Sequence, residues 1–157
     1  EVVDFARFGR DEGVEVRFIE FMPLDADHRW DASAVVPSAE IVAAIVDRFP
    51  AERQERAHDP AERHRYLDGR GGFGVIGTVT EPFCSSCDRV RLTADGQLRA
   101  CLFATEETDL RALLRAGADD DALAAALRTT VAGKWAGHGI SEVHFIRPAR
   151  SMSEIGG

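Results

Sequence analysis

Residues 80–101 read TEPFCSSCDRVRLTADGQLRAC and contain all three cysteines of the chain, Cys84, Cys87 and Cys101. Two cysteines three positions apart in a tight turn can place both thiolates on one side of the backbone. The segment after Cys87 predicts a hairpin with residues 93–96 as its turn, which would bring the third thiolate beside the first two. This spacing favours a metal ion or a metal cluster with one coordination position not filled by cysteine.

Three interpretations of the cysteines stay open on spacing alone. A structural zinc ion would need a fourth ligand, and none of the five histidines has a ligand-like spacing to the cysteines. An iron–sulfur cluster on three thiolates would leave one iron open for a substrate nitrogen or oxygen. The cysteines could also be unrelated buried side chains. The histidines are His28, His58, His64, His138 and His144.

The composition excludes several classes of protein. The formal net charge of the 157 residues is −8. An acidic chain is not a general nucleic-acid binder, because neutralising phosphates needs a basic surface. No apolar run approaches the roughly 20 residues of a membrane span, so we expect no membrane partner. Three cysteines cannot all pair as intramolecular disulfides, which favours metal binding in a reducing, cytoplasmic setting.

The N-terminal region predicts one helix–strand unit. Apolar residues at near-helical spacing predict a helix over residues 1–12 with Gly13 at its C-terminal cap. Residues 14–21 are rich in β-formers and predict a strand. One such unit cannot close a sheet. We therefore expect residues 1–36 to be the last unit of an α/β sheet or barrel that began before Glu1, and residues 37–157 to form a second region.

The middle of the chain predicts one helix and one hairpin. Ser38 is a good N-cap for a helix whose apolar face runs to Phe49. Residues 51–63 are polar and predict a connection. Residues 63–67 and 73–79 predict the two strands of a hairpin, with the glycines between them in its turn.

The C-terminal third predicts two helices and a bare end. The helices begin near residues 108–109 and 119–121, where Thr and Asp side chains can cap them. Residues 147–157 offer little to pack. Their end, Gly156 and Gly157, is either a frayed terminus or a slim probe that reaches into a pocket.

Three arginines are candidates for binding an anion. Arg89 and Arg91 alternate after the second cysteine, and residues i and i+2 of a strand point the same way. Two guanidiniums beside a metal cluster would suit a polyphosphate, although two surface arginines are the simpler alternative. Arg17 lies between apolar residues of a predicted strand. It is either a ligand-binding charge or the partner of a nearby carboxylate, Glu15 or Glu20.

Three segments resemble the GTP 3′,8-cyclase family, the radical S-adenosylmethionine enzymes of the first step of molybdenum cofactor biosynthesis. Residues 81–103 resemble the C-terminal cluster motif of that family, EPFCSSCDRVRLTADGQLRACLF in this chain. Residues 17–22 resemble one of its late barrel strands, and residues 150–157 resemble its double-glycine tail. The three segments occur in family order and span nearly the whole chain.

The resemblance implies a fold and a cluster. The fold would be α/β: the C-terminal part of an incomplete (β/α) barrel of the radical S-adenosylmethionine type, followed by an α+β cluster-binding region. Cys84, Cys87 and Cys101 would hold a [4Fe-4S] cluster whose open iron binds the purine of GTP.

The resemblance also implies roles for further residues. Arg17, Arg89 and Arg91 match positions that contact GTP. Met22 matches a position near S-adenosylmethionine. Gly156 and Gly157 match the tail that enters the active-site pocket, where they would be catalytic residues.

Besides lacking the early barrel strands, the chain departs from the family pattern in two ways. The C-x3-C-x2-C motif of the second [4Fe-4S] cluster, which cleaves S-adenosylmethionine, does not occur. We therefore expect that cluster and S-adenosylmethionine on an N-terminal half outside this sequence, and no activity from this segment alone. The second departure is Asp88, where many members have Asn.

The implied function is the GTP-binding half of an enzyme. The complete enzyme would convert GTP to (8S)-3′,8-cyclo-7,8-dihydroguanosine 5′-triphosphate by radical chemistry. Two alternatives are a non-catalytic zinc- or cluster-binding module and a truncated remnant that binds GTP or a partner without turnover. The sequence leaves the oligomeric state open, with a homodimer as one possibility.

Overall fold

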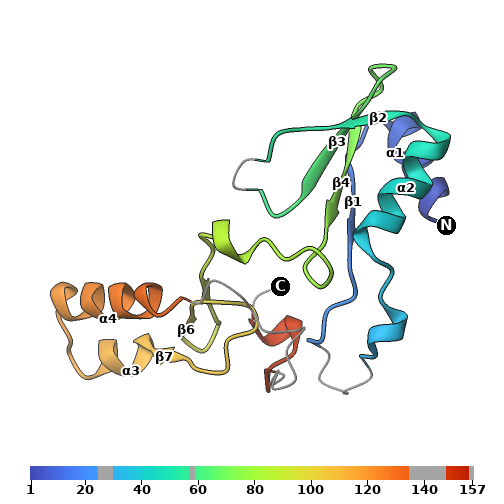
Figure 1. Ribbon diagram of the computed structural model, residues 1–157. Helices are drawn as coiled ribbons and strands as arrows, with labels where there is room; N and C mark the ends of the chain where they lie inside the picture. The colour runs from blue at the N-terminus through green and yellow to red at the C-terminus, as the bar shows by residue number, and fades with distance from the viewer. Residues whose placement is uncertain (25–29, 57–58, 135–147, 156–157) are drawn as a thin grey trace. The chain divides into compact units, whose positions relative to one another are not determined.

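The computed structural model describes residues 1–24, 30–56, 59–134 and 148–155 (Figure 1). These residues form a mixed α/β structure with two small sheets and no barrel. The chain divides into two compact units, Glu1–Met22 with Asp31–Cys87 and Pro23–Trp30 with Asp88–Gly157. The α/β class is thus confirmed. Within the described ranges, no helix is long and apolar enough to cross a membrane.

The first unit is built on a four-stranded sheet with the strand order β1-β4-β3-β2. The edge strand β1 is parallel to its neighbour β4, and the two remaining pairs are antiparallel. The strands are β1 (Val16–Ile19), β2 (Ala51–Arg53), β3 (Glu62–Tyr66) and β4 (Gly72–Ile76). The helices are α1 (Val2–Glu12), α2 (Ser38–Arg48) and the 3-10 turns η1 (Ala32–Ala34) and η2 (Cys84–Ser86).

The core of the first unit lies between the sheet and both helices, which cover the same face (Figure 1). Ile45 of α2 and Phe73 of β4 are almost completely buried there. Phe18 of β1 packs against the same core. Side chains alternate along a strand, so Arg17 and Ile19 project from the opposite face of the sheet.

Local sequence signals in this unit are largely confirmed. Helix α1 ends at Gly13, whose φ of 69° is the left-handed conformation that glycine adopts without strain. The predicted hairpin exists as β3 and β4. The prediction of a polar connection over residues 51–63 was wrong at Ala51–Arg53, because these residues form the edge strand β2 beside β3.

The described residues of the second unit form the three-stranded antiparallel sheet β5-β6-β7 and two helices. Gly96, with a φ of 85°, lies in the predicted turn of the β5-β6 hairpin. Asp109 and Asp119 cap the two helices by accepting backbone N–H groups at 2.7 and 2.9 Å. The elements are β5 (Arg91–Leu92), β6 (Gln97–Arg99), β7 (Thr108–Asp109), α3 (Leu110–Arg115), α4 (Asp120–Ala132) and the 3-10 turn η3 (Met152–Ile155).

Candidate functional site

Cys84 and Cys87 lie in one 3-10 turn of the first unit. Cys84 begins η2, and the N–H of Cys87 donates to the Cys84 carbonyl at 3.2 Å. Cys87 is the C-cap residue of this turn, where the backbone becomes extended (φ −81°, ψ 117°). Both side chains are half-buried. The expected tight turn is confirmed.

Cys101 belongs to the second unit, two residues beyond the end of β6. It is half-buried, and its Sγ accepts the backbone N–H of Phe103 at 3.4 Å. Backbone N–H donors to sulfur stabilise thiolate charge and tune iron–sulfur clusters. The surroundings of Cys101 therefore suit a thiolate ligand.

The donor set fits the predicted cluster in its chemistry. Three cysteine sulfurs are the ligands that iron–sulfur clusters use, and in the described part of the chain none of them is in a disulfide. No group of three or more His, Cys, Asp or Glu side chains is gathered for a metal ion among the described residues. The tri-cysteine centre therefore stays a prediction.

His64 is the one predicted zinc-ligand candidate that lies among the described residues. It is 6% exposed and stacks on Phe73 with ring centroids 4.8 Å apart. Its Nε2 is 3.1 Å from Oε1 of Glu62. Burial lowers the pKa of His64, although the Glu62 carboxylate opposes that effect. These contacts make His64 a core histidine. His28, His58, His138 and His144 lie outside the described residues.

Arg17 is held by two carboxylates on the face of the sheet away from the helices. Its Nε donates to Glu15 at 2.7 Å, and its Nη2 donates to Asp59 at 3.0 Å. The expected carboxylate partner is thus Glu15 and not Glu20. The guanidinium is one-third exposed. A ligand could approach it only by sharing or replacing these carboxylates.

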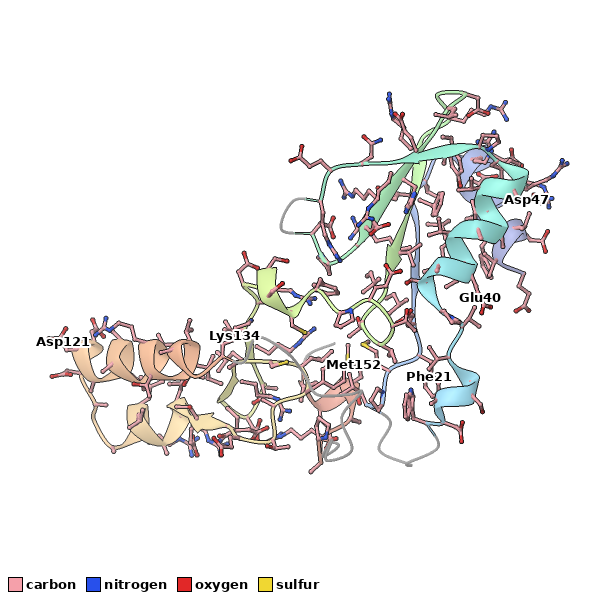
Figure 2. The ribbon with its side chains drawn as sticks, viewed as in Figure 1. Phe21, Glu40, Asp47, Asp121, Lys134 and Met152 are labelled. Carbon is pink, nitrogen blue, oxygen red and sulfur yellow. The ribbon has the colours of Figure 1, made fainter. Side chains whose placement is uncertain are left out.

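Arg89 and Arg91 lie at the start of the β5-β6 hairpin in the second unit. Only Arg91 is in the strand, where it pairs in register with Arg99. Arg89 precedes the strand, so the prediction that strand geometry aligns the two was wrong. The Lys134 ammonium, labelled in Figure 2 after α4, donates to the Arg89 carbonyl. Lys134 is a nearby cation that the sequence patterns did not single out.

Glu20 has a structural role in the first unit that the sequence patterns did not predict. It follows β1 and is 2% exposed, and Met22, half-buried, lies two residues beyond it. Its carboxylate accepts the backbone N–H groups of Ser38, Val79 and Thr80 at 2.8, 2.7 and 2.9 Å. Burial raises the pKa of Glu20, but the hydrogen bonds from these residues together lower it below its usual value.

This arrangement also corrects the expected cap of α2. The helix begins at Ser38, with Pro37 as the N-cap residue, and the Glu20 carboxylate binds the first helical N–H. A carboxylate at a helix N-terminus is favourable because exposed N–H groups carry partial positive charge there. The capping group therefore came from 18 residues earlier in the sequence.

A cavity of about 410 Å³ lies within the first unit. Val42 and Val46 of α2 form one wall, and Val75 of β4 lies opposite. Arg53 and Glu62, at its polar side, pair with each other at 2.6 Å. Its described lining includes neither Arg17, Met22 nor the cysteines, so the cavity is separate from the predicted site residues of this unit.

The end of the described chain is packed, contrary to expectation. Ile155 is completely buried, and the Met152 N–H donates to the Leu24 carbonyl at 3.3 Å. Arg150 pairs with carboxylates of the second unit. Gly156 and Gly157 lie outside the described residues, so their predicted catalytic role stays a prediction.

The motifs and the α/β fold agree with the comparison to known proteins. The profile of the family "Molybdenum Cofactor Synthesis C" matches residues 14–140. This chain belongs to that family. It is 50% identical over 163 residues to GTP 3′,8-cyclase 2 of Mycobacterium tuberculosis H37Rv, a match that covers 100% of this chain and 45% of the relative.

Two further relatives also match along the whole chain. GTP 3′,8-cyclase of Mycobacterium marinum is 49% identical over 163 residues, and that of Mycobacterium sp. KMS is 48% identical over 159 residues. The match falls on the C-terminal region of these relatives. The chain spans less than half their length, 45% in each case. The resemblance read from the sequence is confirmed.

Proposed function

We propose that this chain is the GTP-binding, C-terminal half of a GTP 3′,8-cyclase. The complete enzyme would convert GTP to (8S)-3′,8-cyclo-7,8-dihydroguanosine 5′-triphosphate by a radical S-adenosylmethionine mechanism. The observation that carries the proposal is the 50% identity over the full chain to proteins of that name. S-adenosylmethionine and the [4Fe-4S] cluster that cleaves it would belong to a part of the enzyme outside this sequence.

Cys84, Cys87 and Cys101 would hold a second [4Fe-4S] cluster. When bound, this cluster supplies an iron without a protein ligand, to which a purine nitrogen or oxygen can coordinate. The η2 turn supports Cys84 and Cys87 as ligands, because its hydrogen bond from Cys87 to Cys84 keeps the two residues close together. The N–H donor from Phe103 supports Cys101.

The arginines would orient the triphosphate of GTP. Guanidinium groups grip phosphate oxygens through forked, charge-assisted hydrogen bonds. Arg89 and Arg91 would do this from the β5-β6 hairpin. Arg17 would act from β1, on the face of the sheet opposite the helices. In a (β/α) barrel the helices lie outside and the other face of the strands lines the interior, so in the complete enzyme Arg17 would face that interior.

The remaining predicted residues would contact the reacting molecules. Met22, just beyond the C-terminal end of β1, would lie near S-adenosylmethionine, because active sites of barrel enzymes form at that end of the strands. Gly156 and Gly157 would enter the substrate pocket. Correct orientation of the ribose can contribute several kcal/mol, up to roughly 7–11, to lowering the reaction barrier.

Anaerobic metal analysis of the full-length protein tests the proposal. With both clusters loaded, we expect about eight irons per chain, as follows from two four-iron clusters, and Cys101→Ser should lose about half of them. If the wild-type protein contains one equivalent of zinc and lacks the four irons of the second cluster, the zinc-module alternative is supported and the cluster is contradicted. A gene with no in-frame C-x3-C-x2-C codons before Glu1 would instead favour the remnant that binds without turnover.

A further inference from the structure

A charged network in the second unit holds the segment that precedes the double glycine. The Arg150 guanidinium donates to Asp95 at 2.9 Å (Nη2) and 3.3 Å (Nη1), which is a forked pair. It also contacts Glu107 at 2.8 Å through Nε and 3.0 Å through Nη2. Such two-point contacts fix the orientation of an arginine as well as its position.

The network is anchored in the core of the unit. Glu107 also pairs with Arg99, which is 2% exposed and whose Nη2 donates to the Leu102 and Ala104 carbonyls. Asp95 additionally accepts the Thr93 hydroxyl in the hairpin turn. The hydrogen bonds from Thr93 and Arg150 lower the pKa of Asp95 to about 2, so this carboxylate is charged at neutral pH.

The segment after Arg150 is short and is held by hydrogen bonds and by a buried side chain. Ser151 donates its backbone N–H and its hydroxyl to Glu154 at 2.7 and 2.8 Å, which closes the turn η3. Ile155 then fills the core with no exposed surface. Gly156 follows directly in the sequence. The tail therefore starts from a point that Arg150 and Ile155 define.

We propose that Arg150, through Asp95 and Glu107, is a positioning residue that sets where the Gly156–Gly157 tail begins relative to the β5-β6 hairpin. The inference rests on the proposed function, in which that tail enters the substrate pocket. The hairpin carries Arg91 on its first strand, pairs it with Arg99 on the second, and leads to Cys101 two residues later. The network thus ties the tail to the element that carries two predicted site residues.

Arg150→Gln in the full-length protein tests the inference. Glutamine keeps a polar side chain but cannot contact both carboxylates with charge. We expect backbone hydrogen exchange of residues 151–155 to accelerate about tenfold or more, because local opening becomes easier. We expect turnover to fall about tenfold or more while GTP affinity changes less than about twofold, since misplacement costs orientation and not binding.

Companion variants separate positioning from general damage. Asp95→Asn should reproduce both effects, and the double variant should add little to either single change, because both remove the same pair. Arg150→Lys should restore part of the turnover. Arg128→Gln, on the exposed side of α4, is the matched control and should change neither readout. Glu107 is not substituted, because its loss would leave the buried Arg99 without this carboxylate.

The two readouts distinguish the inference from the proposed function. Unchanged exchange of residues 151–155 in Arg150→Gln overturns the network as an anchor, whatever the turnover. Faster exchange with unchanged turnover overturns the positioning role and shows that the tail start is not critical. If the wild-type protein does not turn over GTP at all, the proposed function fails and the positioning role fails with it.

Discussion

The buried carboxylate of Glu20 accepts the backbone N–H of Thr80 at 2.9 Å, across 60 positions of sequence. It accepts the N–H groups of Ser38 and Val79 as well. One side chain therefore joins the end of β1, the first turn of α2 and the loop that leads to Cys84. The position of the first two cysteines in this unit depends on it.

Glu20→Gln should lower the free energy of unfolding of this chain by about 2 kcal/mol, since hydrogen bonds to a charged acceptor contribute about 1.5–3 kcal/mol and an amide places a donor against buried donors. Urea titration at pH 7 measures the change. Glu40→Gln is the matched control, because Glu40 is exposed in the first turn of the same α2 (Figure 2). An equal loss in both variants would contradict the special role of Glu20.

The contribution of Glu20 should also depend on pH. Burial raises the pKa of Glu20, but the hydrogen bonds that it accepts outweigh burial and leave the pKa below the ordinary value. A carboxylate with a lowered folded-state pKa stabilises the protein above its unfolded pKa, roughly 4.3, and loses that effect as the pH falls through the folded pKa. The stability difference between wild type and Glu20→Gln should therefore shrink below about pH 4.

Local chemistry was readable from the sequence, and long-range polar contacts were not. Gly13, the hairpin turn at Gly96 and the cap at Asp119 were predicted because each depends on a few neighbouring residues. Ser38 was assigned as the N-cap of α2. The carboxylate that caps this helix belongs to Glu20, 18 positions earlier, which local sequence patterns do not identify. Edge strand β2 was missed for the same reason, since only its pairing with β3 distinguishes it from a polar loop.

The candidate site shows the same division. The turn that holds Cys84 and Cys87 follows from their spacing and was predicted. Of the two carboxylates that bind Arg17, only Glu15, two residues away, was among the predicted partners. Asp59 was missed because it is 42 residues away in the sequence. The packed C-terminal segment was missed because its stability comes from Arg150 pairs that reach back 43 and 55 positions.

Arg89→Ala and Arg91→Ala should each weaken GTP binding to the full-length enzyme by about tenfold or more, because each removes a charge-assisted contact to phosphate. Equilibrium binding of GTP at fixed ionic strength measures the effect. The exposed Arg115 in the last turn of α3 provides the control substitution, Arg115→Ala, which should leave affinity unchanged. Wild-type affinity in both test variants would remove these arginines from the GTP site.

Deletion of Gly156 and Gly157 from the full-length enzyme should reduce turnover by about tenfold or more and leave the unfolding midpoint unchanged. The reason is that Ile155, the last residue before them, already completes the packed core. Activity assays and thermal unfolding give the two readouts. The variant Gly157→Ala keeps the length of the tail and tests whether a larger side chain alone disturbs the pocket. Full activity of the deletion would identify the glycines as a terminus without a role in catalysis.

The isolated chain should bind a hydrophobic dye through helix α1. Phe5, Val14 and Ile19 are 56%, 48% and 55% exposed, whereas Val2 and Val16 are half-buried. Phe8, 54% exposed, lies one helical turn after Phe5 on the same side of α1. A contiguous patch of this kind binds environment-sensitive dyes, whereas scattered apolar residues do so weakly.

Replacing both aromatic residues, Phe5→Gln with Phe8→Gln, should therefore reduce dye fluorescence at least about twofold without loss of helix content. Leu67→Gln is the control, because Leu67 is 64% exposed but follows β3 as a single side chain. It should leave the signal nearly unchanged. Equal reductions in the two variants, or no dye binding by the wild-type chain, would show that Phe5 and Phe8 do not form an apolar patch on α1 in solution.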